Sequence, residues 1–199
     1  MLDKIEAAKY VRPCEGETLA GDAVLLQWEA QGLFVAVIDV LGHGRDAHAL
    51  AARLAEIAVK WLSRVSVPSP EASLAVLHEA ASGTRGAIAA AAWLDARTCQ
   101  GNVAGIGNVR CRLFGSVTKS IPFGDGVLGS RMRSTVRTAF ALQPGDVFLL
   151  FSDGIADRFS MNDYPAITLD PGPVIAFNLV RRFGKVHDDA SCAVVRCRW

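Results

Sequence analysis

The 199-residue sequence lacks a long uninterrupted apolar segment, a leader-like start and any strong excess of charge. No stretch reaches the length of a transmembrane helix without a charged residue, and the first residues, including Asp3, Lys4 and Glu6, contain no apolar signal-peptide core. The 21 basic and 20 acidic residues give a net charge of +1, which argues against a surface that binds nucleic acid or membranes through bulk charge. We therefore expect a cytoplasmic protein.

The cysteines lack the spacing of a zinc or redox site, since no CxxC pair occurs. Several lie in strand-like segments, so buried, reduced thiols are the favoured interpretation. Internal repeats, low-complexity stretches and composition breaks are also missing, which predicts a single domain over residues 1–199. The five cysteines are Cys14, Cys99, Cys111, Cys192 and Cys197.

One apolar run ends in an acidic residue and a glycine-bracketed histidine: residues 34–44 read FVAVIDVLGHG. Its length, its β-branched residues and its terminal glycines predict a buried strand. Asp39 then lies at the edge of a hydrophobic core. A carboxylate in that position is costly unless it is paired, hydrogen-bonded or bound to a cation.

Three further acids occupy similar positions at strand ends. Asp153 follows an apolar run, and Asp22 and Asp188 stand just before one. If the four residues after Trp28 form a hairpin turn, the antiparallel register places Asp22 directly opposite Asp39, with Cβ atoms about 5 Å apart. Two carboxylates that close need a shared proton or a cation.

The rest of the chain predicts helices and further strands around this hairpin. Apolar spacing predicts a helix over residues 46–65, a Ser-Pro-Glu start predicts a second helix from Ser69 to about Ser82, and Asp170-Pro171 begins a last helix that Gly184 ends. This order favours antiparallel sheets covered by helices, an α+β fold. Strands are expected at residues 9–12, 23–39 (the hairpin), 87–94, 103–106, 109–114, 134–142, 147–151 and 190–197.

Other polar residues have simpler interpretations. His43 is expected to be a turn residue rather than a metal ligand, and Asp46 is expected to cap the helix that follows. Asp189 should point to the opposite face of its strand from Asp188, outside the ligand set. Arg85 is more typical of a surface arginine than of a phosphate ligand. The acids expected in loops are Asp125, Asp157 and Asp163.

Four motifs occur in order along nearly the whole chain: Gly21-Asp22, Asp39-Val40-Leu41-Gly42-His43-Gly44, Leu142 through Pro144-Gly145-Asp146 to Ser152-Asp153-Gly154, and Asp188-Asp189-Ala190-Ser191. Together they resemble the PPM family of metal-dependent serine/threonine protein phosphatases, in its SpoIIE-like branch. The resemblance implies two packed antiparallel sheets flanked by helices. Three shorter motifs resemble the stressosome phosphatases of the RsbX type: Thr84-Arg85-Gly86-Ala87, Gly105-Ile106-Gly107-Asn108-Val109 and Lys185-Val186-His187-Asp188-Asp189.

The resemblance also implies a centre of two Mn²⁺ or Mg²⁺ ions. Asp39 would bridge both ions, Asp153 and Asp188 would complete one site, and Asp22 with the Val40 carbonyl would complete the other. A water shared by the ions would attack phosphorus directly, without a covalent enzyme intermediate. The catalytic residues expected from the resemblance are Asp39 and Asp153.

The substrates implied by the resemblance are stressosome-type regulators similar to RsbS and RsbR, phosphorylated on serine or threonine. We expect a monomer, because every apolar stripe is used by a predicted helix or sheet, and no nucleic-acid or membrane partner. Many eukaryotic members of the family bind phosphate through an arginine upstream of the first acid. Only Arg12 lies in the matching region here, and it does not stand in a clear match to that motif. Phosphate would then be recognised by the metals alone or by Arg85.

Two alternative functions stay open from the sequence. One is a non-catalytic module of the same fold that binds a phosphoprotein, and the other is a phosphatase for small phosphate esters. The presence of all four acids argues against the first, because a pure binding module has no need to hold that much negative charge together.

Overall fold

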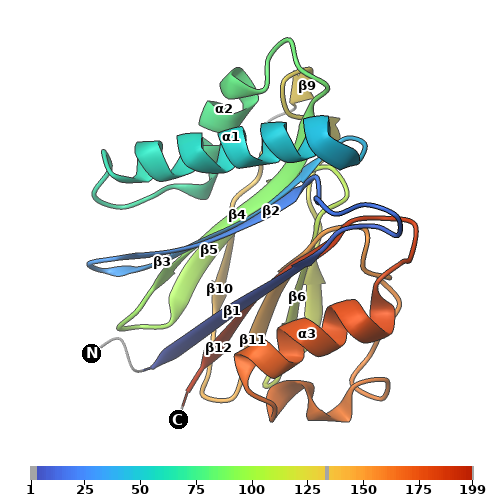
Figure 1. The fold of residues 1–199 in the computed structure, drawn as a ribbon. Coiled ribbons are helices and arrows are strands. Elements are labelled where there is room, and N and C mark those ends of the chain that lie inside the picture. The colour runs from blue at the N-terminus through green and yellow to red at the C-terminus, as the bar shows by residue number, and fades with distance from the viewer. Residues whose placement is uncertain (1–3, 133–134, 199) are drawn as a thin grey trace.

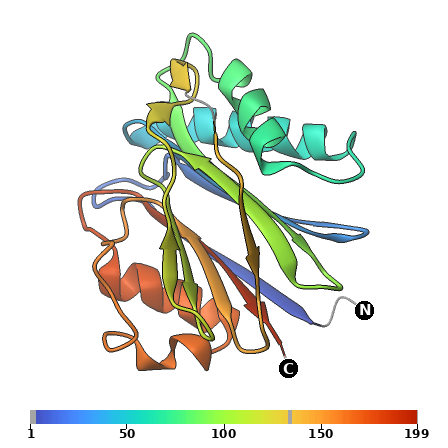
Figure 2. The same cartoon turned by 180° about the vertical axis from the view of Figure 1, so that it is seen from behind.

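The chain folds into two antiparallel five-stranded sheets that pack face to face, with helices on both outer faces (Figures 1 and 2). The structure, a computed structural model, describes residues 4–132 and 135–198. No helix in these two ranges is long and apolar enough to cross a membrane. The arrangement is an α+β sandwich, which confirms the predicted fold class.

The first sheet contains the hairpin predicted from the sequence. Trp28 pairs with Leu33, and Asp22 lies opposite Asp39, so the predicted register is confirmed. The strands of this sheet, in spatial order, are β10 (Thr138–Ala141), β5 (Gln100–Ile106), β4 (Ala87–Asp95), β3 (Gly32–Val40) and β2 (Asp22–Glu29).

The second sheet brings the two ends of the chain together, because its first and last strands in the sequence are neighbours (Figure 1). A short hairpin of two strands, β8 (Gly126–Val127) and β9 (Arg131–Met132), follows this sheet's edge strand. The strands of the second sheet, in spatial order, are β1 (Ile5–Arg12), β12 (Ala190–Cys197), β11 (Val147–Phe151), β6 (Arg110–Phe114) and β7 (Lys119–Ile121).

Among the described residues, three α-helices and one 3₁₀ helix complete the fold. Helices α1 and α2 cover the outer face of the first sheet, and α3 covers that of the second (Figure 1). Helix α1 turns to its sheet the apolar stripe that the spacing of the sequence predicted, with Leu50, Leu54 and Leu62 buried. Their bounds are α1 (Gly44–Leu62), α2 (Pro70–Ala80), η1 (Pro165–Thr168) and α3 (Gly172–Phe183).

Helix α1 begins earlier than the sequence predicted. Its N-cap residue is His43, and Gly44 is its first residue, so Asp46 lies within the first turn instead of capping the helix. The prediction of Asp46 as the cap was therefore wrong. An acid in the first turn still interacts favourably with the helix dipole, and Asp46 also pairs with Arg85 at 3.7 Å.

The strands differ from prediction mainly in length. β1 begins at Ile5, four residues before the predicted start, and the strand expected over 134–142 is reduced to β10. Ser134 lies outside the described residues. The strands β7, β8 and β9 were not predicted, because two or three residues are too few to show an alternating pattern.

The main core fills the space between the two sheets, and further apolar clusters lie under the helices. Phe140 of the first sheet stacks on Phe148 of the second, with ring centroids 4.5 Å apart. All five cysteines are buried and free, as predicted.

Replacing Phe148 by alanine should lower the free energy of unfolding by about 3–5 kcal/mol, because the ring is buried and its loss opens a cavity between the sheets. Phe177→Ala on α3 is the matched control, since that ring is 42% exposed and should cost much less. Urea unfolding of both variants measures the difference. Equal losses would contradict this account of the core.

Candidate active site

Four acidic residues lie at the ends of four strands, two from each sheet. Asp22 begins β2 and Asp39 is the next-to-last residue of β3, where the two face each other. Asp153 stands two residues after β11, and Asp188 two residues before β12, and these strands are also paired. β12 packs against β2 and β3, and the charges of Asp22, Asp153 and Asp188 all act on Asp39, so both pairs of acids meet at one end of the sandwich.

The electrostatics of these residues show that they share one environment. Burial, reinforced by the charges of Asp22, Asp153 and Asp188, raises the pKa of Asp39 to about 9. Burial likewise raises the pKa of Asp22 to about 7, although the hydroxyls of Ser152 and Ser191 oppose this shift. Without a cation, the cluster therefore retains protons at neutral pH.

The pKa of Asp188 follows the same pattern. It is raised by burial and then by the negative charge of Asp153. The backbone of this residue is held separately: Arg12 donates to the Asp188 carbonyl at 3.2 Å and also to the carbonyl of Lys185. The Arg12 side chain therefore holds the loop that carries Asp188.

The donor set suits a hydrated divalent cation. Asp22 Oδ2 is buried, and among residues 4–132 and 135–198 it has no hydrogen-bond partner, which leaves an acceptor open inside the cluster. Within the same ranges, no three His, Cys, Asp or Glu side chains are gathered closely enough to form a metal cage by themselves. Mg²⁺ is usually bound through one or two carboxylates and keeps several waters, so a closed cage is not required.

Asp189 supports the position of Asp22. The sequence did not predict this supporting role. The Asp189 carboxylate is buried and accepts hydrogen bonds from the amides of Gly21, at 2.7 Å, and Cys14, at 2.8 Å. The amide of Val40 in turn donates to the Gly21 carbonyl at 3.1 Å. The residue before Asp22 is thus tied both to the loop before β12 and to the end of β3.

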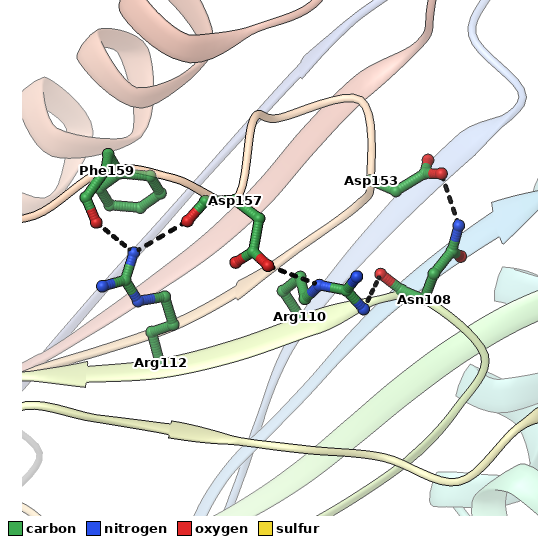
Figure 3. Close-up of polar contacts among 6 residues, drawn as sticks. All are labelled: Asn108, Arg110, Arg112, Asp153, Asp157 and Phe159. Carbon is green, nitrogen blue, oxygen red and sulfur yellow. Dashed lines mark hydrogen bonds and ion pairs between the residues drawn. The ribbon is translucent and has the colours of Figure 1, made fainter.

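Asn108 makes the corresponding contact to Asp153. This residue lies in the turn between β5 and β6, and its side-chain amide donates to Asp153 Oδ2 at 2.5 Å (Figure 3). Arg110 donates to the Asn108 carbonyl at 3.0 Å and pairs with Asp157 at 3.3 Å. One carboxylate oxygen of Asp153 is therefore oriented by the turn that joins β5 of the first sheet to β6 of the second.

Arg112 anchors the segment that follows Asp153. Its guanidinium lies 4.6 Å from the ring centroids of both Phe114 and Phe159. It donates to the carbonyls of Asp157 and Phe159 (Figure 3). Asp157 does lie in a loop, as the sequence predicted, but its contacts to β6 were not foreseen. Only the Gly-Asn turn was visible in the sequence as a signal for this network.

The remaining candidates lie at the rim of the cluster. His43 contacts Glu17 at 2.9 Å and is exposed. The Arg85 guanidinium donates to the Leu41 carbonyl at 3.3 Å, so Arg85 lies beside the loop that follows Val40. Neither contact is with one of the four acids.

The family model that describes stage II sporulation protein E (SpoIIE) matches residues 29–169. The chain belongs to the SpoIIE family. Membership of this family, together with the shared fold of its structural relatives, makes the chain a serine/threonine phosphatase of the PPM type. The resemblance noted in the sequence is therefore confirmed. No curated protein matches the sequence at a significant level.

Three solved structures share this fold over nearly the whole length of both chains. A chain from the bacterial stressosome, described as a modular system adapted to control secondary messenger signalling, is 29% identical with a TM-score of 0.84, covering 97% of this chain and 100% of its own. RsbX in complex with magnesium is 20% identical, with a TM-score of 0.80 and coverages of 97% and 95%. The catalytic domain of the serine/threonine phosphatase PstP with two manganese ions is 17% identical, with a TM-score of 0.70 and coverages of 98% and 99%.

The raised pKa of Asp39 predicts how the stability of the metal-free phosphatase depends on pH. The native state keeps this proton up to about pH 9, whereas the carboxyl of the unfolded chain loses it near its ordinary pKa of 3.8. Because the native state binds more protons between these values, its free energy of unfolding should fall as pH rises through this window. Asp39→Asn should make the fall shallower. Urea unfolding in the presence of a chelator at a series of pH values measures the free energy of unfolding. The same change of this free energy with pH in the wild type and in Asp39→Asn would contradict the raised pKa of Asp39.

Replacing Asp189 by alanine should leave the amides of Gly21 and Cys14 without their acceptor, at a cost of about 1–3 kcal/mol for each buried group. The loop before Asp22 should loosen, so hydrogen exchange at the Gly21 amide should speed up. Asp163→Ala, which removes a carboxylate that accepts from Ser160 in an exposed loop, is the control. Unchanged exchange at Gly21 would contradict the supporting role of Asp189.

Proposed function

We propose that this phosphatase removes phosphate from phosphoserine and phosphothreonine in proteins with the help of two Mn²⁺ or Mg²⁺ ions. The ligands would be Asp22, Asp39, Asp153 and Asp188, with the Val40 carbonyl. The observation that carries the proposal is the meeting of four carboxylates at one end of the sandwich, where burial and mutual repulsion raise the pKa of Asp39 to about 9. A dication would relieve this repulsion.

The chain's own residues prepare this chemistry. Asp22 offers a buried carboxylate oxygen that is free to bind, and Asp39 must give up its proton before it can act as a ligand. Asn108 keeps Asp153 in one orientation. When bound, the ions would supply a water of lowered pKa and would neutralise the phosphoryl oxygens. Asp39 and Asp153 are the proposed catalytic residues.

The proposed substrates are phosphorylated stressosome proteins similar to RsbS and RsbR, with the enzyme acting as negative feedback on stress signalling. The support is the likeness to a stressosome chain and to RsbX over nearly the full length of both proteins. A single domain over residues 1–199, a monomeric state, cytoplasmic residence and the absence of nucleic-acid or membrane partners belong to the same proposal.

Two other functions are weaker. A module that only binds phosphoproteins would gain nothing from buried carboxylates that repel one another and would also repel the phosphate. A phosphatase for small phosphate esters needs the same acids but no surface for a protein, and comparing turnover of a phosphoprotein with that of a small ester separates it from the proposal.

Asp153→Asn should abolish most phosphatase activity and also the rise in melting temperature that Mn²⁺ produces by mass action. The metal-free variant should fold at least as stably as the wild type, because one negative charge leaves the cluster. Asp163→Asn, in the exposed loop further along the chain, should keep activity and the Mn²⁺ response. Near wild-type turnover of a phosphorylated protein by Asp153→Asn would refute the metal site.

A further inference from the structure

A groove of about 630 Å³ opens beside the acid cluster. One of its walls is formed by the turn at Asn108 and by β6, whose residues Arg110 and Arg112 lie on the same face, as residues two apart in a strand do (Figure 3). The segment from Ser120 to Val127 completes the lining, and its first two residues belong to β7, which pairs with β6. The groove therefore runs between β6 and the chain that leaves β7.

The groove is continuous with the proposed active site. Asn108, which lines it, donates directly to Asp153. Leu41, which also lines it, follows Val40 and is 42% exposed, so a large apolar side chain stands open at the rim. A substrate whose phosphate reached the four acids would extend its neighbouring residues into this groove.

The chemistry of the groove favours an uncharged occupant. Arg110 is paired with Asp157, and Arg112 is held by two aromatic rings and two carbonyls, so the positive charge of each guanidinium is already partly engaged within the protein. With Asp125, the formal charges of the lining side chains cancel.

Apolar side chains form much of the remaining surface. Phe123 lies flat against Gly105, where a Cβ atom would come within 2.5 Å of the ring, so this glycine allows the aromatic wall. Other apolar residues that line the groove are Ile88, Ile121, Pro122 and Val127.

We infer that this groove binds an extended segment of the substrate protein, next to the phosphorylated residue, that carries an apolar side chain. The inference rests on the proposed function, which it refines: phosphate would be recognised at the acids, and the neighbouring sequence would be recognised in the groove. Small phosphate esters would use the acids alone.

The test compares short phosphothreonine peptides with leucine or with glycine next to the phosphorylated residue, and p-nitrophenyl phosphate as a small ester, all with Mn²⁺. The wild type should hydrolyse the leucine peptides with the higher kcat/KM, mainly through a lower KM. In Ser120→Trp, whose indole would fill the groove from exposed β7, the ratio of kcat/KM for the leucine peptide to that for the ester should fall at least about tenfold. Ser66→Trp, between α1 and α2, is the matched control and should leave the ratio unchanged.

The outcomes separate the inference from the function on which it rests. Equal kcat/KM for leucine and glycine peptides, or an unchanged ratio in Ser120→Trp, would overturn the groove while leaving phosphatase activity intact. Hydrolysis of the ester without any peptide turnover would overturn both the groove and the choice of protein substrates. If the wild type hydrolysed neither the peptides nor the ester in the presence of Mn²⁺, the proposed function itself would be refuted.

Discussion

The repulsion among four carboxylates is the constraint on which this end of the molecule depends. Burial makes the charged forms costly, and each acid raises the cost for the others, so Asp39 holds its proton to about pH 9 in the absence of a cation. Such an arrangement destabilises the protein unless protons or cations compensate it. The rest of the sandwich must supply the stability that keeps the acids together, and its large apolar core between two sheets does so.

Hydrogen bonds from outside the cluster keep these acids in place. Asp189 ties the residue before Asp22 to the loop before β12, and Asn108 orients Asp153. Arg12 holds the loop of Asp188. Each of these contacts joins segments far apart in the chain, so the geometry of the cluster depends on the correct pairing of whole strands and not on local turns.

The sequence predicted the parts of this site that follow from local pattern. Apolar runs ending in acids marked the strand ends, and counting from Trp28 and Leu33 predicted that Asp22 faces Asp39. Contacts such as Asn108 to Asp153 could not be predicted, because they depend on how separate strands are ordered in a sheet. The Asp46 cap failed for a local reason: Gly44 adopts a φ of +80°, and the N-cap lies at His43, three residues earlier. The groove beside the cluster is lined by β6, which the sequence predicted, and by the segment from Ser120 to Val127, whose short strands carry no periodic signal.

The most direct test of the account is calorimetric titration of Mn²⁺ into the metal-free phosphatase in two buffers of different ionisation enthalpy. The account predicts saturable binding of two ions per chain, with release of protons from the cluster at neutral pH, because acids of raised pKa must ionise to become ligands. Asp39→Asn should lose the tight binding and most of the proton release. Absence of Mn²⁺ binding by the wild type, or the same binding and proton release in Asp39→Asn, would contradict it.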